Sequence, residues 1–299
     1  LLTAYAENIT TVEGLKSIPL TWDNTKNEET GEYNVANNGQ MLGCFTNSTP
    51  SNNSIDESLV INSTNVKLHA WLRRAASKVT VAFDGSNLKE GVFIYIQSVQ
   101  IKDIPSQCYL GKDNNVGKEG YTLKVPENGP DMIDGEIITY HEGDKAEDFE
   151  YGEGCADHRV TVGSPHFGSH DETAPALYFY ENMQGAGGNM PDKRQDADGN
   201  GSLDHPGLPG DETYRLKDNV PYGTYIEVHA HCISNNSERL GNGHIIYRFM
   251  LGQDVIKDYN AKRNCHYKLT LKFKNFANEA DWHIEYEEPE PGVMTPEPY

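Results

Sequence analysis

The chain has 299 residues and a formal net charge of −20, from 25 basic and 45 acidic side chains. A surface this acidic repels phosphate backbones and anionic lipids, so nucleic acids and anionic membranes are disfavoured as partners. The length is about twice that of an ordinary domain and predicts two domains. The five cysteines form no C-x-x-C motif, which removes support for a zinc ribbon or a thioredoxin-like site.

Alternating apolar and polar residues predict strands throughout the first half of the chain. Residues 23–58 are polar and predict surface loops around a short apolar segment at Met41–Phe45. Period-two alternation then begins, which is typical of half-buried strands. The strands predicted there are Val66–Leu72, Val79–Phe83, Val92–Ile101 and Tyr121–Val125.

Residues 126–157 are acidic and contain scattered Gly and Pro, so we place the domain boundary in this stretch. Strands resume after it, at Arg159–Val162, Ala176–Tyr180, Thr224–Cys232, His244–Leu251, Tyr267–Phe273 and Trp282–Tyr286. Only Ser86–Glu90 and Val255–Ala261 show weak helical character. Strands joined by loops without crossover helices predict an all-β fold of antiparallel Greek-key β-sandwiches.

The predicted organisation is therefore an N-terminal sandwich over residues 1–140 and a C-terminal sandwich over 141–286. Four prolines make residues 287–299 unsuitable as a central strand, so this tail is interpreted as an extended linker or arm.

One acidic loop has the residue order of a calcium site. Asp196, Asp198 and Asn200 alternate with other residues, and Gly201, Ser202, Leu203 and Asp204 follow. This order matches the first nine positions of a D-x-D-x-[DN]-G calcium loop. The predicted Ca²⁺ ligands are Asp196, Asp198, Asn200, Ser202 and Asp204, in a role that orders the loop.

A second candidate metal group is Glu227-x-His229-x-His231, since period two places its members on one face of a strand. A solvent-facing polar row is the competing interpretation, and the sequence favours it because no further ligand stands out. His158, His166 and His170 lie in a Gly- and Pro-containing stretch and are interpreted as loop polarity.

No nucleophile elbow, Walker A motif or dinucleotide-binding glycine motif is present in the sequence. The sequence thus predicts no catalytic residues and favours a structural or adhesive protein. A secreted metal-dependent or carbohydrate-directed enzyme or binding protein is the alternative, and a deep pocket with perturbed ionisable groups would distinguish it.

Four segments in order resemble the fimbrillins, the fimbrial subunits of Bacteroidales bacteria. They are Ile18-Pro19-Leu20 with the later Leu72-Arg73-Arg74-Ala75-Ala76-Ser77-Lys78-Val79-Thr80-Val81, Leu177-Tyr178-Phe179-Tyr180-Glu181-Asn182, Tyr259–Thr270 with its Arg263-Asn264, and Asp281-Trp282-His283-Ile284-Glu285-Tyr286. Each motif is weak alone, but together they span roughly residues 18 to 286.

The resemblance implies two transthyretin-like domains in tandem, secretion as a lipoprotein precursor, and a place on the outer surface or in a fimbrium. It also implies assembly with other fimbrial subunits by strand exchange, a form of β-augmentation, and a host or bacterial surface ligand. In this interpretation Leu1–Leu20 belongs to the exchanged or groove-lining region. The Pro-rich tail departs from the pattern of stalk subunits and resembles a junction to further domains.

Overall fold

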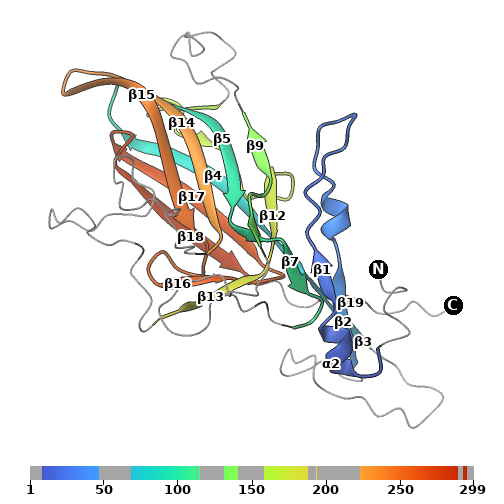
Figure 1. Cartoon of the computed structure of the whole chain (residues 1–299). Helices are drawn as coiled ribbons and strands as arrows, with labels where there is room; N and C mark the ends of the chain where they lie inside the picture. The colour runs from blue at the N-terminus through green and yellow to red at the C-terminus, as the bar shows by residue number, and fades with distance from the viewer. Residues whose placement is uncertain are drawn as a thin grey trace.

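The computed structural model describes residues 9–46, 69–112, 114, 131–140, 158–187, 193, 223–288 and 292–294. Within these ranges the chain is almost entirely β-structure, as the alternation predicted (Figure 1). The helical segments described are the single turn α2 (Val12–Lys16) and the 3₁₀ helix η1 (Val35–Asn38). The side chain of Thr11 caps α2 by accepting a hydrogen bond from the Gly14 amide.

Two five-stranded sheets form the larger part of the molecule. The first, called here the β14 sheet, contains β10 (Arg159–Val160), β5 (Val92–Lys102), β14 (Tyr225–Asn236) and β15 (Arg239–Met250) in that order, with β9 (Ile137–Thr139) also on β5. The second, the β17 sheet, contains β11 (His166–Phe167), β4 (Ala76–Leu88), β17 (His266–Asn275) and β18 (Ala280–Glu287), with β12 (Ala176–Tyr180) also on β4.

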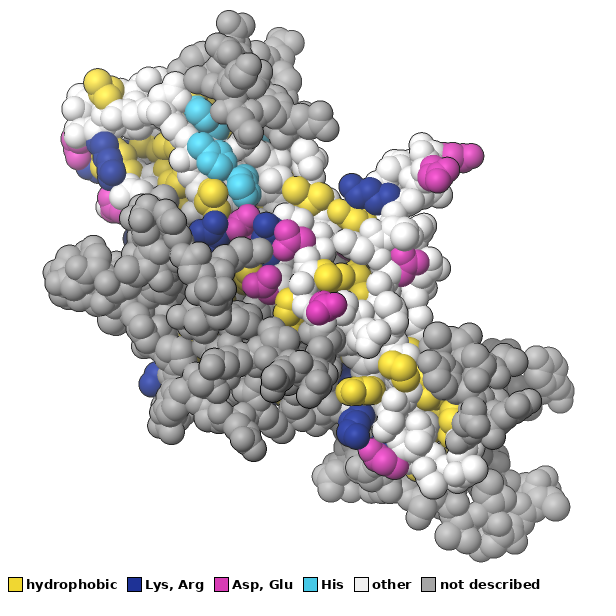
Figure 2. Space-filling model, viewed as in Figure 1, with side chains coloured by type: hydrophobic (Ala, Val, Ile, Leu, Met, Phe, Trp, Pro, Cys, Tyr) yellow, Lys and Arg dark blue, Asp and Glu magenta, His cyan; other side chains and the backbone are white. Residues whose placement is uncertain are grey.

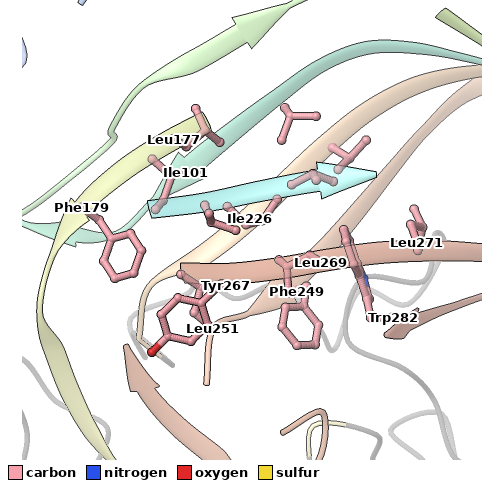
Figure 3. Close-up of a cluster of buried hydrophobic side chains, with 14 of the residues drawn as sticks. Ile101, Leu177, Phe179, Ile226, Phe249, Leu251, Tyr267, Leu269, Leu271 and Trp282 are labelled. Atoms are coloured by element: carbon pink, nitrogen blue, oxygen red, sulfur yellow. The ribbon is translucent and has the colours of Figure 1, made fainter. Parts of the chain in front are cut away.

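The inner faces of these two sheets pack against each other as a sandwich. Tyr247 of β15 contacts Phe273 of β17 with ring centroids 5.6 Å apart, and Phe249 lies 5.3 Å from Trp282 of β18. Figure 3 shows Leu269 and Leu271 of β17 in the same layer as Ile226 and Phe249 from the other sheet. The alternating positions of β17 predicted from sequence are the ones that fill this core.

The sandwich does not divide where the sequence predicted a domain boundary. β5 precedes residues 140 and 141 but pairs along its length with β14, and β4 likewise pairs with β17. Each large sheet therefore takes strands from both sides of the predicted boundary. The described part of the acidic stretch 126–157 contains β9, which belongs to the β14 sheet, so an acidic Gly- and Pro-containing composition did not identify a linker between domains here.

β4 and β17 run parallel, from Lys78 opposite His266 to Leu88 opposite Asn275, which differs from the antiparallel sheets that were predicted. The other strand pairs described are antiparallel. Short turns impose antiparallel pairing, but these two strands are far apart in sequence, so their connection leaves either direction open.

Two smaller sheets lie to one side of the sandwich in Figure 1 and are called the N-terminal sheets. One pairs β1 (Pro19–Thr21) with β7 (Gln107–Tyr109), and the other has the order β19 (Gly292–Met294), β3 (His69–Arg74), β2 (Met41–Thr46). Two further pairs join β13 (Asn182–Ala186) to β16 (Asp258–Ala261) and β6 (Ile104–Pro105) to β8 (Met132–Ile133).

Three local predictions differ from the structure or fall outside it. β4 continues to Leu88 through the helix candidate Ser86–Glu90, and β16 occupies part of the candidate Val255–Ala261. Part of the tail forms the edge strand β19 instead of only a linker. The predicted strand Tyr121–Val125 lies outside the described residues.

The sandwich core predicts the effect of truncating one of its side chains. Leu269 is fully buried, so Leu269→Ala should lower the free energy of unfolding by about 2–5 kcal/mol, through lost apolar contact and a residual cavity. Leu240 is 75% exposed on β15, and Leu240→Ala should change stability by less than about 0.5 kcal/mol. Urea denaturation of both variants measures the difference, and equal losses would contradict this assignment of the core.

Candidate functional site

Arg263, in the turn between β16 and β17, connects the sandwich to the segment that carries β7. Its guanidinium donates to the carbonyl oxygens of Tyr109 at 2.9 Å, Leu110 at 3.1 Å and Lys112 at 2.7 Å. Nη2 and Nε also donate to Oε2 of Glu181, at 3.0 and 3.2 Å. The planar fork of arginine suits this arrangement, because its five N–H groups can serve several fixed acceptors at once.

Glu181 follows β12 and is buried beside Arg263. Its carboxylate also accepts a hydrogen bond from the Asn114 amide at 2.9 Å, while Nδ2 of Asn114 donates to the Glu181 carbonyl at 2.8 Å. The side chains of Glu181 and Arg263 are only 6% and 15% exposed, so the pair is held away from water. A buried ion pair is tolerated when its remaining hydrogen-bonding groups are also satisfied, as they are here.

Asn264, the next residue, holds the corner between β3 and β4. It adopts a left-handed backbone with φ of 58°, a conformation that asparagine tolerates better than most residues. Its Oδ1 accepts a hydrogen bond from the Arg74 amide at 3.1 Å, and its own amide donates to the Ala76 carbonyl. Arg263 and Asn264 thus hold both N-terminal sheets against the sandwich, and we call Arg263, Glu181, Asn114 and Asn264 the junction.

Aromatic contacts reinforce the junction. The ring of Trp22, which follows β1, meets Tyr180 edge-on at 4.8 Å, and the Tyr180 hydroxyl donates to Oε1 of Gln40. Burial raises the pKa of the Cys108 thiol to about 12, despite the nearby Arg263 charge. That thiol is therefore protonated and behaves as a small apolar group in this contact.

The outer face of the β14 sheet carries the strand-borne group predicted at Glu227. Arg248 donates to Glu227 at 2.7 Å, Lys102 lies 3.4 Å away, and Nε2 of His229 contacts Oε1 at 3.0 Å. Burial alone would raise the pKa of Glu227, but the hydrogen bonds from His229 and Arg248 and the two cationic charges lower it to about 2. Glu227 is therefore ionised at neutral pH.

His231 does not join His229 in a common site. Its Nε2 contacts Oδ1 of Asn242 on β15, whereas Nδ1 of His229 lies 3.2 Å from Nε2 of His244, also on β15. In the part of the chain that the structure describes, no three His, Cys, Asp or Glu side chains are arranged to hold a metal ion. The sequence missed His244, although a tight turn after Asn236 would have placed it opposite His231.

The predicted calcium ligands Asp196, Asp198, Asn200, Ser202 and Asp204 lie outside the described residues, so the calcium loop stays a prediction. Lys193 is described close by and is fully buried. Its Nζ donates to the carbonyls of Met250 and Asp254 at 2.8 and 2.9 Å, between the rings of Phe249 and Tyr259. Burial lowers the pKa of this amine to about 7.

A second group of histidines covers part of the β17 sheet. Oγ1 of Thr80 lies 2.8 Å from Nδ1 of His170 and 2.9 Å from Nε2 of His266, and His170 also reaches Thr270. Burial lowers the pKa of both histidines, to about 4 for His266. His170, assigned from sequence to loop polarity, in fact holds its loop across β4 and β17.

Strand β15 forms one border of the sandwich, and half of it is exposed. In the described part of the chain β15 pairs only with β14, and its residues 239–244 are solvent-exposed. A hollow of about 370 Å³ lies between this half-strand and the turn at residues 276–278. Burial raises the pKa of Cys232, which lines the hollow, to about 11, so its thiol is a poor nucleophile there.

Glu136, between β8 and β9, is a buried carboxyl group without an ionic partner in the described structure. Its side chain is almost wholly buried, Oε1 has no hydrogen-bond partner, and the Tyr178 amide donates to the carboxyl group. Burial raises the pKa of Glu136 to about 7, a change that the hydrogen bond from Tyr178 only partly offsets.

No helix among the described residues is long and apolar enough to cross a membrane. Comparison with protein families matches residues 177–271 to a domain of unknown function, DUF4906. That range begins in β12 and ends in β17, and it includes Glu181, Arg263 and the β14–β15 hairpin. No curated protein matches the chain.

Several solved structures are similar to the chain. One proposed cell adhesion protein from Parabacteroides distasonis has a TM-score of 0.44 at 11% identity, covering 96% of this chain and 79% of that one. A second from the same organism has a TM-score of 0.39 at 11% identity, covering 94% and 70%. The tip fimbrial protein Mfa3 from Porphyromonas gingivalis has a TM-score of 0.38 at 10% identity, covering 95% and 75%. All three TM-scores are below 0.5, so these likenesses carry no argument about function.

The junction predicts a large effect of replacing Arg263. Arg263→Ala leaves the Glu181 carboxylate buried without its partner and should lower the free energy of unfolding by about 3–5 kcal/mol. Arg263→Lys should recover little of this, because one ammonium cannot serve Glu181 and three carbonyls together. Chemical denaturation is the measurement. Lys89→Ala, which breaks an exposed pair with Glu238, is the control and should cost less than about 1 kcal/mol. Wild-type stability of Arg263→Lys would show that charge alone suffices.

Burial of Glu136 predicts a defined pH dependence. Its pKa is about 7 in the folded protein against 4.5 for an exposed glutamate, so the folded state binds more protons between these values and stability falls as pH rises. Glu136→Gln lacks this titration. The free energy of unfolding of the variant minus that of the wild type should therefore increase by roughly 1–3 kcal/mol from pH 4.5 to pH 8. Urea denaturation across this range measures it, and a constant difference would contradict the assignment.

Proposed function

We propose that the chain is a non-enzymatic subunit of a fimbrium, or an adhesin-like component of one, on the surface of a bacterium. The observation that carries this proposal is the pairing of Glu181 with Arg263 at 3.0 Å. These residues belong to two of the four segments that resemble the fimbrillins, and they are 82 positions apart. Their buried contact gives the two motifs one shared structural role, and this supports the proposal.

The finer architecture follows from the same resemblance. The large sandwich would be one transthyretin-like domain, and the N-terminal sheets would belong to a second, smaller one. The precursor would be secreted as a lipoprotein and reach the outer-membrane surface or a fimbrium. The strongly acidic chain suits an exposed, soluble surface, and the predicted calcium loop would order one of its long connections.

Assembly would occur by strand donation at β1. This strand pairs with β7 over only three residues, yet Ile18 and Leu20 are buried in the main hydrophobic core and Trp22 packs against Tyr180. A short strand that contributes large apolar side chains covers a groove that a partner's strand of similar pattern could fill instead. Backbone hydrogen bonds continue beside the β1–β7 pair, from the Trp22 amide to the Ser106 carbonyl and from the Leu110 amide to the Ile18 carbonyl, and a donated strand would have to replace them.

A reversible lock on β1 tests this mechanism. Thr21 and Gln107 are exposed and lie opposite each other in the β1–β7 pair. A disulfide in the double variant Thr21→Cys/Gln107→Cys would fasten β1 to β7. Expressed as the full precursor in its own bacterium, the oxidised variant should remain monomeric in surface extracts analysed by size-exclusion chromatography. Reduction should restore multimers, and each single-cysteine variant should assemble like the wild type.

The possible results distinguish strand exchange at β1 from the role as a fimbrial subunit. Equal assembly of the oxidised and reduced double variant would contradict exchange at β1 while leaving the subunit role intact. A wild-type precursor that forms no multimers and is missing from surface structures, judged by immunogold labelling, would contradict the subunit role itself.

A further inference from the structure

The outer face of the β14–β15 hairpin carries a pair of histidines whose geometry is unexplained by packing or assembly. We call His229 and His244 the histidine pair. Nδ1 of His229 and Nε2 of His244 are 3.2 Å apart, and the ring centroids are 5.1 Å apart. The side chain of His229 is 34% exposed, and His244 is exposed. Figure 2 shows histidine side chains gathered on this face, beside acidic and basic groups.

Glu227 fixes the protonation of His229. The Glu227 carboxylate accepts a hydrogen bond from Arg248 at 2.7 Å and lies 3.0 Å from Nε2 of His229, so it acts as the acceptor and the Nε2 atom carries the proton. Nδ1 of His229 is then an unprotonated lone pair directed at Nε2 of His244. A carboxylate that holds the distal nitrogen of a histidine is the usual support behind a metal-binding imidazole.

The spacing of the two nitrogens fits a shared ion. With zinc–nitrogen bonds of about 2.0–2.1 Å, two nitrogens 3.2 Å apart subtend an angle of about 100° at the metal, near the tetrahedral value. Neutral imidazole can present its lone pair at either nitrogen, so His244 becomes a ligand by moving its proton to Nδ1.

Arg248 contacts Oε2 of Glu227, and Lys102 contacts Oε1, the oxygen that also meets His229. Both contact Glu227 and neutralise its charge, and Lys102 also lies 3.3 Å from Asp134. The Glu227 carboxylate is therefore occupied by two cationic side chains as well as by His229. Its role is to orient the ligand, while His231, which lies opposite His244 in the strand pair, contacts Asn242 through its Nε2.

We propose that His229 and His244 bind a transition-metal ion of the zinc type, with Glu227 orienting His229. The ion has two protein ligands, and water completes its coordination. Imidazole nitrogens select Zn²⁺, Cu²⁺ or Ni²⁺ over Ca²⁺ and Mg²⁺, which prefer oxygen. The site lies on the outer face of an edge hairpin, where its open positions can accept a ligand from solvent or from another protein.

Isothermal titration of the purified chain with Zn²⁺ tests the proposal, in excess Mg²⁺ so that acidic loops are occupied. His244→Ala changes an exposed side chain, so folding should be preserved, and thermal unfolding without metal checks this. The variant should bind Zn²⁺ at least about tenfold more weakly, a loss of about 1.4 kcal/mol. Glu227→Gln should weaken binding by about 10- to 100-fold through the loss of orientation.

His283→Ala is the matched control. His283 is exposed and lies 3.7 Å from the carboxylate of Glu285 on β18, so it reproduces an exposed histidine beside an acid on the other sheet. Because His283 is not part of the proposed site, His283→Ala should bind Zn²⁺ like the wild type. Electron paramagnetic resonance of the Cu²⁺-loaded protein should show two imidazole nitrogens in the wild type and one in His244→Ala. Equal Zn²⁺ affinity of wild type and His244→Ala, or a single coordinated nitrogen in the wild type, would overturn the proposal.

Discussion

The guanidinium of Arg263 is the point at which the sandwich and the N-terminal sheets are fastened together. One side chain gathers the carbonyls of residues 109, 110 and 112 and the carboxylate of Glu181, while the adjacent Asn264 fixes the corner from β3 into β4. Desolvating two charges is costly, and it is acceptable here because nearly every donor and acceptor has a partner. The position of β1 and β7 relative to the sandwich follows from this arrangement.

The buried glutamates in the described part of the chain differ in the cationic side chains that contact them. Glu181 is matched by one guanidinium, and Glu227 by Arg248, Lys102 and His229 together. Glu136 has no cation paired with it in the described structure, and burial moves its pKa toward neutrality. In a chain of net charge −20 basic side chains are fewer than acidic ones, and here they pair with Glu181 and Glu227. The result is local neutrality around Glu181 and Glu227 within a strongly acidic protein.

Alternation in the sequence predicted the strands that carry one clearly apolar face, and β17 and β12 lie where it placed them. It could not predict which strands become neighbours, because an alternating strand fits any partner of similar pattern. The parallel β4–β17 pair and the sharing of both sheets across residue 140 were missed for this reason. Arg263 and Glu181 were recognised only as parts of motifs, since nothing local in either segment identifies a partner 82 positions away. His244 was missed because the contact depends on hairpin register.

The parallel pairing of β4 with β17 also determines when the protein can fold. β4 lies near the start of the described sandwich, and its central neighbour ends at Asn275. A nascent chain cannot pair β4 with β17 until residues 266–275 have emerged, and β5 similarly waits for β14. Contacts between strands far apart in sequence slow folding, because the entropy cost of closing the long loop between them comes before the strand pairing that offsets it. The early strands β4 and β5 therefore stay without their central partners until β14 and β17 have been made, so the topology itself delays folding of the sandwich during synthesis.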